Sequence, residues 1–559
     1  MVTRISLFIV LISATVLSTL GATASPTVVG DPAKPDLLPS ALQRAYQQVA
    51  RSIVIMRGIY KLPDTGGPVF AMTRWRDAVI TGKGVTLIMT GLKWGEDCFQ
   101  LKHCHHLLLQ DLTISQSAVP NYQGRVQSIG RDASGNLTAV WKADTGYPDL
   151  PASTSTFPGA LNVVDAHTHE LKVGDGDTYN APVAHLSNGS WRIDFRNSAQ
   201  LVSVGDWLVG RYGTPPIKLH LVNCRNCTIQ NVTLLRNGFA PIREEGGGGN
   251  RYIHCTLRQG PMPAGADTPD LVTNAADGMH MTGSYPGPDI EDCYFTGVFL
   301  DDCIAIHGYF SQVKSVVGNM ITTTKAAGDN AVVGGSIRIS NANGFYEDAK
   351  VSAVKNNPDG TTTLTIKSSL PIPVGAKFSN PLADGAGYKI ISCRLGDTRS
   401  RGILAKADDG TIENNVISHC GMSAISLGPE YYWDEADYVH SVLVQGNNIQ
   451  YNGGATYGGA AVWVHGHGAV GNQHVLITNN RFFSNYQGDL VIEWAHYVAV
   501  TNNVVRAPHL WPATVHQVAP IRLDHCNNIS FANDNLYNTT FWSLPLVHVG
   551  HDVKDITLP

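Results

Sequence analysis

A six-residue pattern recurs along most of this chain, and it restricts the possible folds more than any other feature of the sequence. In this pattern an apolar residue is followed by a polar residue, an Asn-like residue, two variable positions and a second apolar residue. Clear copies begin at Ile229, Ile290, Ile412, Val444, Ile477, Val500 and Phe531, and weaker copies at Leu109 and Tyr252. The Asn-like residues of successive copies are 23 to 38 residues apart, except at two long gaps.

A repeat of this length with β-branched apolar positions predicts a right-handed parallel β-helix. Each coil buries its apolar side chains, while the Asn-like residue at the bend adopts the left-handed conformation and hydrogen-bonds to its neighbour in the next coil. A leucine-rich repeat has a similar period but requires a dense leucine pattern that is missing here. Only 15% of the residues are charged, and the chain has 56 Gly and 29 Pro. This composition disfavours helix bundles, so the predicted fold class is all-β.

The two long gaps of 120 and 122 residues predict two insertions. Each gap holds one coil and roughly 90 further residues. Both contain a strand, a Gly-containing turn and a second strand, at 126–140 and at 351–366. We therefore predict two small antiparallel, barrel-like β modules at 117–216 and 310–390. The β-helix coils are then expected at 25–116, 217–309 and 391–559.

The first 24 residues have the organisation of a secretory signal peptide. Arg4 provides a basic start, an apolar stretch covers 6–20, and Ala-Thr-Ala at 22–24 provides a cleavage site. The apolar stretch is short and contains Ser and Thr, which disfavours a membrane span. Six Asn-x-Ser/Thr sequons suit an extracellular glycoprotein. We expect a secreted protein.

Two groups of Cys and His residues resemble metal ligands. They are His-Cys-His-His at 103–106 and the Cys-x-x-Cys motif at 224–227. Neither has the second half that a tetrahedral zinc site requires. Cys104, Cys224 and Cys526 share one position of the repeat, and equivalent positions stack in a β-helix, so we interpret them as core residues. We expect no metal ion and no organic cofactor.

Three carboxyl groups are the candidate catalytic residues. Asp277 precedes Asp301 and Asp302 by 24 and 25 residues, which is the length of one coil. Residues one coil apart are neighbours on adjacent strands, about 4.7–4.9 Å apart. Like charges held this close raise at least one pKa, which places a general acid beside a general base. The structural alternative is that the Asp-Asp pair caps a turn and that Asp277 forms a turn with Gly278.

The residues around these carboxyl groups resemble the pectin-lyase-like superfamily. Polygalacturonases of glycoside hydrolase family 28 share the Asp-Asp-Cys-Ile-Ala pattern at 301–305. The sequence more closely resembles glycoside hydrolase family 110, a family of exo-acting α-1,3-galactosidases. Its Ala-Asp-x-x-His segment is matched at 276–280, and its Asp-Asp-x-x-x-x-His-Gly segment at 301–308, directly before an insertion.

This resemblance implies a glycoside hydrolase that cleaves an α-galactoside-type bond with inversion, using Asp277, Asp301 and Asp302. An inverting pair has carboxyl groups about 6.5–9.5 Å apart. The resemblance to polygalacturonases favours Asp301 as the acid. Those enzymes also carry an Arg-x-Lys pair, whereas Arg-Ile-Ser at 338–340 lacks the lysine. We therefore predict a neutral sugar as the substrate.

Five further residues are predicted to bind the substrate. They are His280, His307, Glu244, Glu430 and Trp433. Two other functions stay open: a polygalacturonase-like pectin hydrolase, and a non-catalytic carbohydrate-binding or structural β-helix. The expected partner in every case is an oligo- or polysaccharide. The net charge of −5 provides no electrostatic surface for nucleic acid.

Overall fold

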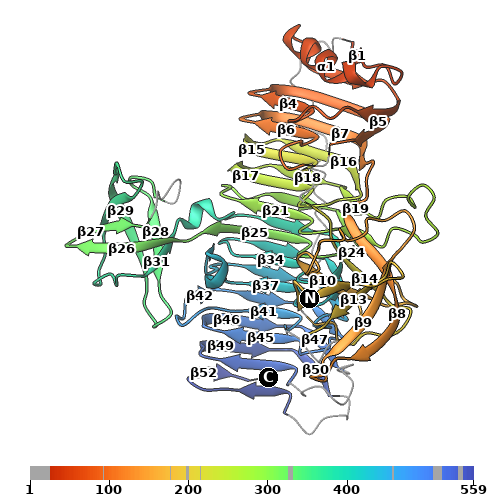
Figure 1. The fold of residues 1–559 in the computed structure, drawn as a ribbon. Helices are drawn as coiled ribbons and strands as arrows, with labels where there is room; N and C mark the ends of the chain where they lie inside the picture. The colour runs from red at the N-terminus through yellow and green to blue at the C-terminus, as the bar shows by residue number, and fades with distance from the viewer. Residues whose placement is uncertain are drawn as a thin grey trace, which may run out of the picture.

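The computed structural model describes residues 25–558, apart from 92, 177, 197–200, 214–215, 325–330, 456–458, 508–518 and 539–544. Its strands form a 39-stranded sheet wound into a column, a seven-stranded sheet and a closed six-stranded barrel. The coils stack from α1 (Leu38–Gln47) at one end to β52 (Lys554–Thr557) at the other (Figure 1). The prediction of a right-handed parallel β-helix with two antiparallel insertions is confirmed. The predicted signal peptide, 1–24, lies outside the described residues.

The first apolar residue of each repeat forms one continuous stack inside the column. Parallel pairing places these residues opposite one another in neighbouring coils, and all of them are buried. The stack, in chain order, is Leu109, Ile229, Tyr252, Ile290, Ile390, Ile412, Val444, Ile477, Val500 and Phe531. Each large apolar side chain buried in this way stabilises the fold by about 1.5–3 kcal/mol.

The bends of the coils also follow the repeat. Its third residues, from Asp111 to Asn533, all have φ between 51° and 67°. The predicted hydrogen bonds between bends occur partly at these residues, as between Asn231 and Asp111 at 2.9 Å. A longer ladder is formed by the residues that follow them. Its members are buried or partly buried and hydrogen-bond in series: Asn415, Asn447, Asn480, Asn503 and Asp534.

The N-terminal end of the column is capped by a short helix. Following η1 (Pro35–Leu37), helix α1 buries Leu38, Leu42 and Ala45. These residues lie four and three positions apart, so they share one face of the helix, which packs against the first coils. The cap covers a sheet edge that would otherwise be open to pairing with another chain. No helix among the described residues is long and apolar enough to cross a membrane.

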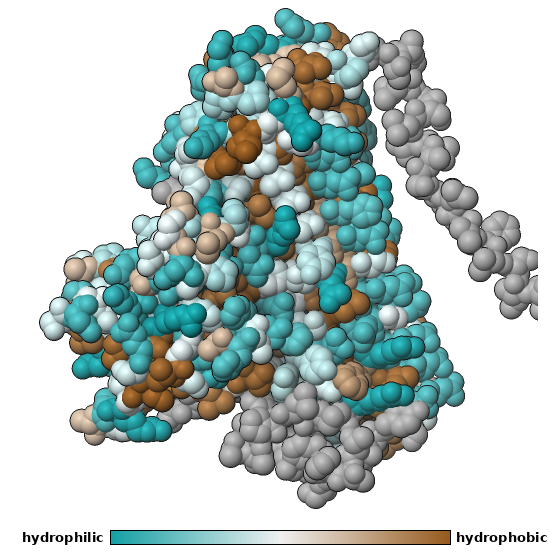
Figure 2. Space-filling model, turned by 90° about the vertical axis from the view of Figure 1, so that its right-hand side faces the viewer, coloured by the Kyte–Doolittle hydropathy of each residue, from teal (hydrophilic) through white to brown (hydrophobic). Residues whose placement is uncertain are grey.

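The first insertion is an antiparallel sheet that lies beside the column (Figure 1). Its strand order is β11-β10-β14-β8-β9-β13-β12, and its core contains the buried rings of Trp141 and Trp191. The face on this side of the molecule mixes hydrophobic with hydrophilic residues, and hydrophilic ones predominate (Figure 2). The strands are β8 (Asn121–Arg131), β9 (Leu137–Ala143), β10 (Ala160–Val164), β11 (Thr178–Tyr179), β12 (Val183–His185), β13 (Trp191–Asp194) and β14 (Trp207–Arg211).

The second insertion is a closed barrel that projects from the column where β25 (Ile304–Tyr309) ends (Figure 1). Its interior is filled by buried apolar residues, among them Ile321, Ile337 and Phe378. The strands are β26 (Ser311–Val317), β27 (Met320–Thr323), β28 (Ser336–Ser340), β29 (Tyr346–Asn356), β30 (Thr362–Lys367) and β31 (Lys377–Ser379). The boundaries of the units given above stay a prediction.

The cysteines are core residues. All ten lie within the described part of the chain, and all ten are buried with free thiols. Cys104 and Cys224 occupy equivalent positions of neighbouring coils, one residue before the paired residues His105 and Arg225. This placement agrees with their interpretation as stacked residues of the β-helix.

Candidate active site

The register of three neighbouring coils positions the candidate catalytic residues. Parallel pairing joins three strands so that Asp277, Asp302 and Arg401, each two residues before its strand, occupy equivalent positions. Asp301 lies at the adjacent position. The strands are β21 (Met279–Thr282), β25 (Ile304–Tyr309) and β34 (Ile403–Ala405).

The three carboxyl groups lie very close together. One oxygen from each of Asp277, Asp301 and Asp302 lies within 4.8 Å of the other two. The backbone N–H of Asp302 donates to Oδ1 of Asp277 at 3.3 Å, which links the two coils directly. These nearest oxygens are closer than the 6.5–9.5 Å expected between the carboxyl groups of an inverting pair.

Desolvation and mutual repulsion raise the pKa of two of these carboxyl groups, which makes them weaker acids than an ordinary aspartate. Desolvation, reinforced by the charge of Asp277, raises the pKa of Asp301 from 3.8 to about 6. Desolvation and the charge of Asp301 likewise raise the pKa of Asp302 to about 6, against the opposing effect of Arg401. The side chain of Asp301 is 40% exposed and that of Asp302 only 4%. Asp301 is thus the more accessible of these two protonatable groups.

Two arginines from the next coil partly compensate the negative charge. Nη2 of Arg399 lies 3.4 Å from Oδ1 of Asp301, and Nη1 of Arg401 lies 3.4 Å from Oδ2 of Asp302. The backbone N–H of Arg401 also donates to Oδ1 of Asp302 at 2.7 Å. The three carboxyl groups are close enough to surround a cation, but these guanidinium groups already provide positive charge at two of them.

The hydrogen bonds of His280 and His307 define where their protons lie. Nδ1 of His307 donates to the carbonyl oxygen of Gly308 at 2.7 Å, so its Nε2 is free to accept. Nε2 of His280, 3.2 Å away, is then the donor between the two rings. Nδ1 of His280 contacts Oδ2 of Asp277 at 2.8 Å, a contact that also holds a proton.

The surroundings keep His307 uncharged. Desolvation, followed by the nearby His280 and Lys406, holds the pKa of His307 well below its ordinary value of 6.5. A neutral His307 can accept the hydrogen bond from His280 but cannot supply a second positive charge. The series of hydrogen bonds from Gly308 through His307 and His280 to Asp277 thus fixes the orientation of the Asp277 carboxyl group.

A buried ion-pair network forms the adjoining wall. Nζ of Lys406 donates to Oε2 of Glu430 at 2.8 Å and also contacts Glu435, and Arg401 contacts the other oxygen of Glu430. Burial alone would raise the pKa of Glu430, but Arg401 and Lys406 hold it well below its ordinary value. Glu430 is therefore an ionised anchor for both cations.

The three carboxyl groups, the two histidines and the two arginines line an open cleft of about 680 Å³, together with Glu430 and Glu435. Three exposed aromatic rings surround it: Tyr432 is 87% exposed, Trp433 64% and Tyr179 50%. Tyr432 and Trp433 belong to η4 (Tyr431–Trp433), whereas Tyr179 belongs to β11 of the first insertion. Exposed aromatic rings are suited to stacking against the apolar face of a sugar.

The structure brings together seven of the eight residues predicted from the sequence. The cleft is lined by Asp277, Asp301, Asp302, His280, His307, Glu430 and Trp433. Glu244 is not among the lining residues. It lies on β17 (Ile242–Gly248), is fully buried, and accepts hydrogen bonds from Tyr252 at 2.8 Å and Ser284 at 2.6 Å. Its side chain points into the coil on the same face as Ile242, so the expectation for Glu244 does not agree with its position.

Several residues in and beside the cleft were not predicted from the sequence, namely Arg399, Arg401, Lys406, Glu435 and Tyr179. The β25–β34 pairing places Ile304 opposite Ile403, so the repeat resumes 99 residues later, beyond the second insertion. Continuing this register would have placed Arg401 beside Asp302. No repeat signal locates Tyr179, because the inserted sheet does not follow the coil register.

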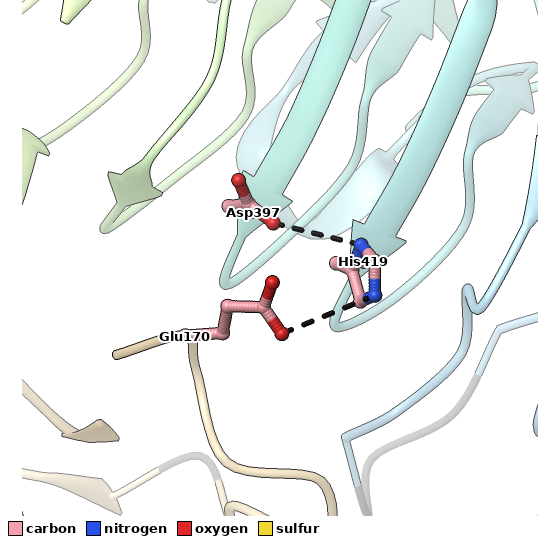
Figure 3. A group of neighbouring side chains, drawn as sticks. All are labelled: Glu170, Asp397 and His419. Atoms are coloured by element: carbon pink, nitrogen blue, oxygen red, sulfur yellow. Dashed lines mark ion pairs between the residues drawn. The ribbon is translucent and has the colours of Figure 1, made fainter. Parts of the chain in front are cut away.

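A second group of ionisable side chains lies where the first insertion meets the coils (Figure 3). Nδ1 of His419 lies 3.6 Å from Oδ1 of Asp397, and its Nε2 lies 4.0 Å from Oε2 of Glu170. Asp397 and His419 come from β33 (Arg394–Thr398) and β36 (Val416–Cys420), which are neighbouring coil strands, and Glu170 from the insertion. The two carboxylates face opposite edges of the imidazole, an arrangement that favours a bridge between ion pairs over chelation of a metal through one nitrogen.

No family model matches the chain. A stretch of 217 residues, 36% of this chain, is 26% identical to the α-1,3-galactosidase A of Bacteroides fragilis and spans 35% of that protein. The chain thus spans about a third of the length of this curated relative.

Among solved structures, the chain is similar to the catalytic domain of a GH87 α-1,3-glucanase in complex with nigerose. That match has a TM-score of 0.42 and 10% identity, and covers 95% of this chain and 68% of that one. The A-module of the mannuronan C-5 epimerase AlgE4 from Azotobacter vinelandii matches with a TM-score of 0.40 and 8% identity, over 96% of both chains. The surface adhesin PfbA of Streptococcus pneumoniae matches with a TM-score of 0.36 and 9% identity, over 95% and 94%.

Proposed function

We propose that this protein is a glycoside hydrolase that cleaves an α-galactoside-type bond of an oligo- or polysaccharide. The observation that carries the proposal is the cluster of Asp277, Asp301 and Asp302, open to a cleft of about 680 Å³ and flanked by exposed aromatic rings. Two carboxyl groups, one protonated and one ionised, are the minimum required for glycoside hydrolysis. The partial identity to a protein named α-1,3-galactosidase supports the same class of reaction.

In this mechanism Asp301 is the general acid. Its pKa of about 6 keeps a proton available in mildly acidic solution, and its side chain is the more exposed of the Asp-Asp pair. It donates this proton to the glycosidic oxygen as the bond from that oxygen to the anomeric carbon breaks. An ionised neighbour, Asp277 or Asp302, takes a proton from the water that attacks the anomeric carbon.

The charge pattern of the cleft favours a neutral sugar over galacturonate. Arg399 is engaged by Asp301, Arg401 by Asp302 and Glu430, and Lys406 by Glu430 and Glu435. Each of these three cations in or beside the cleft therefore already has a carboxylate partner from the protein. A substrate carboxylate would have to compete with these partners, whereas a neutral pyranose needs only hydrogen bonds and a ring to stack on.

Secretion and glycosylation are part of this proposal and rest on the sequence of residues 1–24 and on the sequons. The division into coils at 25–116, 217–309 and 391–559, with insertions at 117–216 and 310–390, is likewise proposed. The proposed organisation leaves the catalytic residues in the coils and places the insertions around them.

The test is a substrate panel assayed with the purified chain. We expect hydrolysis of α-1,3-linked galactosyl oligosaccharides and little or none of polygalacturonate. Turnover of polygalacturonate alone would instead support the pectin-hydrolase alternative. Binding of an oligosaccharide without any turnover would support the non-catalytic alternative.

Stereochemistry needs its own measurement. The resemblance implies inversion, whereas the nearest carboxyl oxygens lie within 4.8 Å, closer than is typical of inverting pairs. Proton NMR of the first product distinguishes the two outcomes. Initial release of β-galactose from an α-linked substrate would establish inversion, and initial release of α-galactose would overturn it.

A further inference from the structure

We propose that the first insertion supplies the wall of the cleft that binds the sugar on the leaving-group side of the scissile bond, with Tyr179 as the contacting residue. The proposal rests on the proposed glycoside hydrolase function and deepens it. It makes the substrate a carbohydrate with at least two linked sugars, and it makes an inserted sheet determine part of its specificity.

Tyr179 has the position that this role requires. Among the described residues that line the cleft, it is the one contributed by the insertion, and its ring is half exposed. The guanidinium carbon of Arg399 lies 5.6 Å from the centre of this ring. Arg399 in turn contacts Asp301, the proposed acid, at 3.4 Å. Tyr179 thus lies on the same side of the cluster as the group that protonates the leaving oxygen.

The other exposed rings belong to a different wall. Tyr432 and Trp433 lie two and three residues after Glu430, which contacts Arg401, and Arg401 contacts Asp302. The cleft therefore has aromatic rings of two origins: one pair carried by a coil, and one ring carried by the insertion. A disaccharide that places its scissile bond at the carboxyl cluster can meet both walls at once.

Residues 170–176, which precede Tyr179 in the insertion, contact the coils at two points. The backbone N–H of Gly174 donates to the carbonyl oxygen of Gly454 at 2.7 Å. Glu170, at the start of the segment, faces His419, which also faces Asp397 (Figure 3). Asp397 is only two residues from Arg399. These contacts position the segment against the same turn that carries the arginine beside the proposed acid.

Two substrates separate this role from a general effect on the cleft. The leaving group of an α-1,3-linked galactosyl disaccharide is a sugar, whereas the leaving group of α-galactosyl fluoride is a fluoride ion. Tyr179→Ala should reduce kcat/KM for the disaccharide about tenfold, mainly through KM, because a stacking contact is lost. Hydrolysis of the fluoride should change by less than about twofold, since no lost contact involves the sugar that both substrates share.

Three further variants sharpen the result. Tyr179→Phe keeps the ring and should behave like the unchanged chain. Tyr212→Ala removes an exposed ring of the same insertion that does not line the cleft, and should change neither substrate. Glu170→Gln, at a positioning residue, should show the selectivity of Tyr179→Ala with a smaller amplitude. An equal loss on both substrates in Tyr179→Ala, or no loss on the disaccharide, would overturn the proposal.

A binding measurement keeps this inference distinct from the proposed function. In a chain carrying Asp301→Asn, calorimetry should show about tenfold weaker binding of the disaccharide when Tyr179→Ala is added. If the unchanged chain hydrolyses neither substrate but binding weakens in this way, the proposed function fails and the sugar-binding wall stands. Unchanged affinity for the disaccharide would overturn the proposal that the first insertion forms a sugar-binding wall.

Discussion

Two clusters of carboxyl groups with raised pKa values lie near the second insertion, and they differ in their access to solvent. The first contains Asp301 and Asp302, whose pKa values are raised to about 6. In the second, around Arg338, desolvation raises the pKa of Asp437 to about 6 as well. The first cluster opens into a cleft of about 680 Å³, whereas Asp437 and Arg338 are both buried. A raised pKa therefore does not identify a catalytic group by itself, and the two clusters are distinguished by their access to the cleft.

The closed cluster joins the barrel to the column. Arg338 of β28 contacts Asp408 at 2.9 Å and Asp437 at 3.2 Å, and donates to the carbonyl oxygen of Tyr438 at 2.8 Å. Ser379 of β31 donates to Asp437 at 2.6 Å. Two barrel strands are thus tied to coil residues through one guanidinium group and one carboxyl group. This cluster serves the packing of the two units.

The largest effect on stability is expected when the closed cluster loses its cation. Arg338→Met should lower the free energy of unfolding by about 3–5 kcal/mol, because it leaves buried carboxylates without their cation. Arg192→Met, which breaks the exposed pair with Asp194, is the matched control and should cost about 1 kcal/mol or less. Urea denaturation measures both. A similar small loss in the two variants would show that the buried network does not hold the barrel.

A smaller effect concerns the pH dependence of stability. The folded chain holds the proton of Asp437 up to about pH 6, whereas an unfolded aspartate titrates near 3.8. The stability from this group is therefore fully present below about pH 4 and is lost as the pH rises through about 6. Asp437→Asn removes this titration. Between pH 4.5 and 7.5 the free energy of unfolding of this variant should therefore fall by about 1–3 kcal/mol less than that of the unchanged chain. Parallel slopes in the two chains would contradict the raised pKa.

The smallest effect concerns catalysis by the open cluster. If Asp301 must be protonated, kcat/KM should fall about tenfold for each pH unit above about 6. The fall follows from the loss of the acid form as the pH rises through its pKa. Rates on a disaccharide measured from pH 4 to pH 8 check this. A rate that stays constant to pH 8 would exclude a general acid with this pKa.

The contrast between the two clusters also shows how far the sequence leads. Asp277 and Asp302 are separated by one coil without an insertion, so the length of the repeat is enough to predict that they lie side by side. Arg401 is reached only by carrying the register across an insertion of unknown path. Glu244 shows a different limit, because the alternation from Ile242 turns its side chain inward. Arg338 lies in a barrel, and no coil repeat relates it to Asp437.

The most direct test of the central claim applies the same substitution to one carboxyl group of each cluster. Asp301→Asn and Asp437→Asn both replace an aspartate whose pKa is raised to about 6. We expect Asp301→Asn to lower kcat on an α-1,3-linked galactosyl disaccharide by about 10²–10⁴-fold, since an acid–base group is lost. Asp437→Asn should keep kcat within about twofold, because its carboxyl group does not reach the cleft. Full activity of Asp301→Asn, or an equal loss in both variants, would contradict the assignment of the open cluster as the catalytic centre.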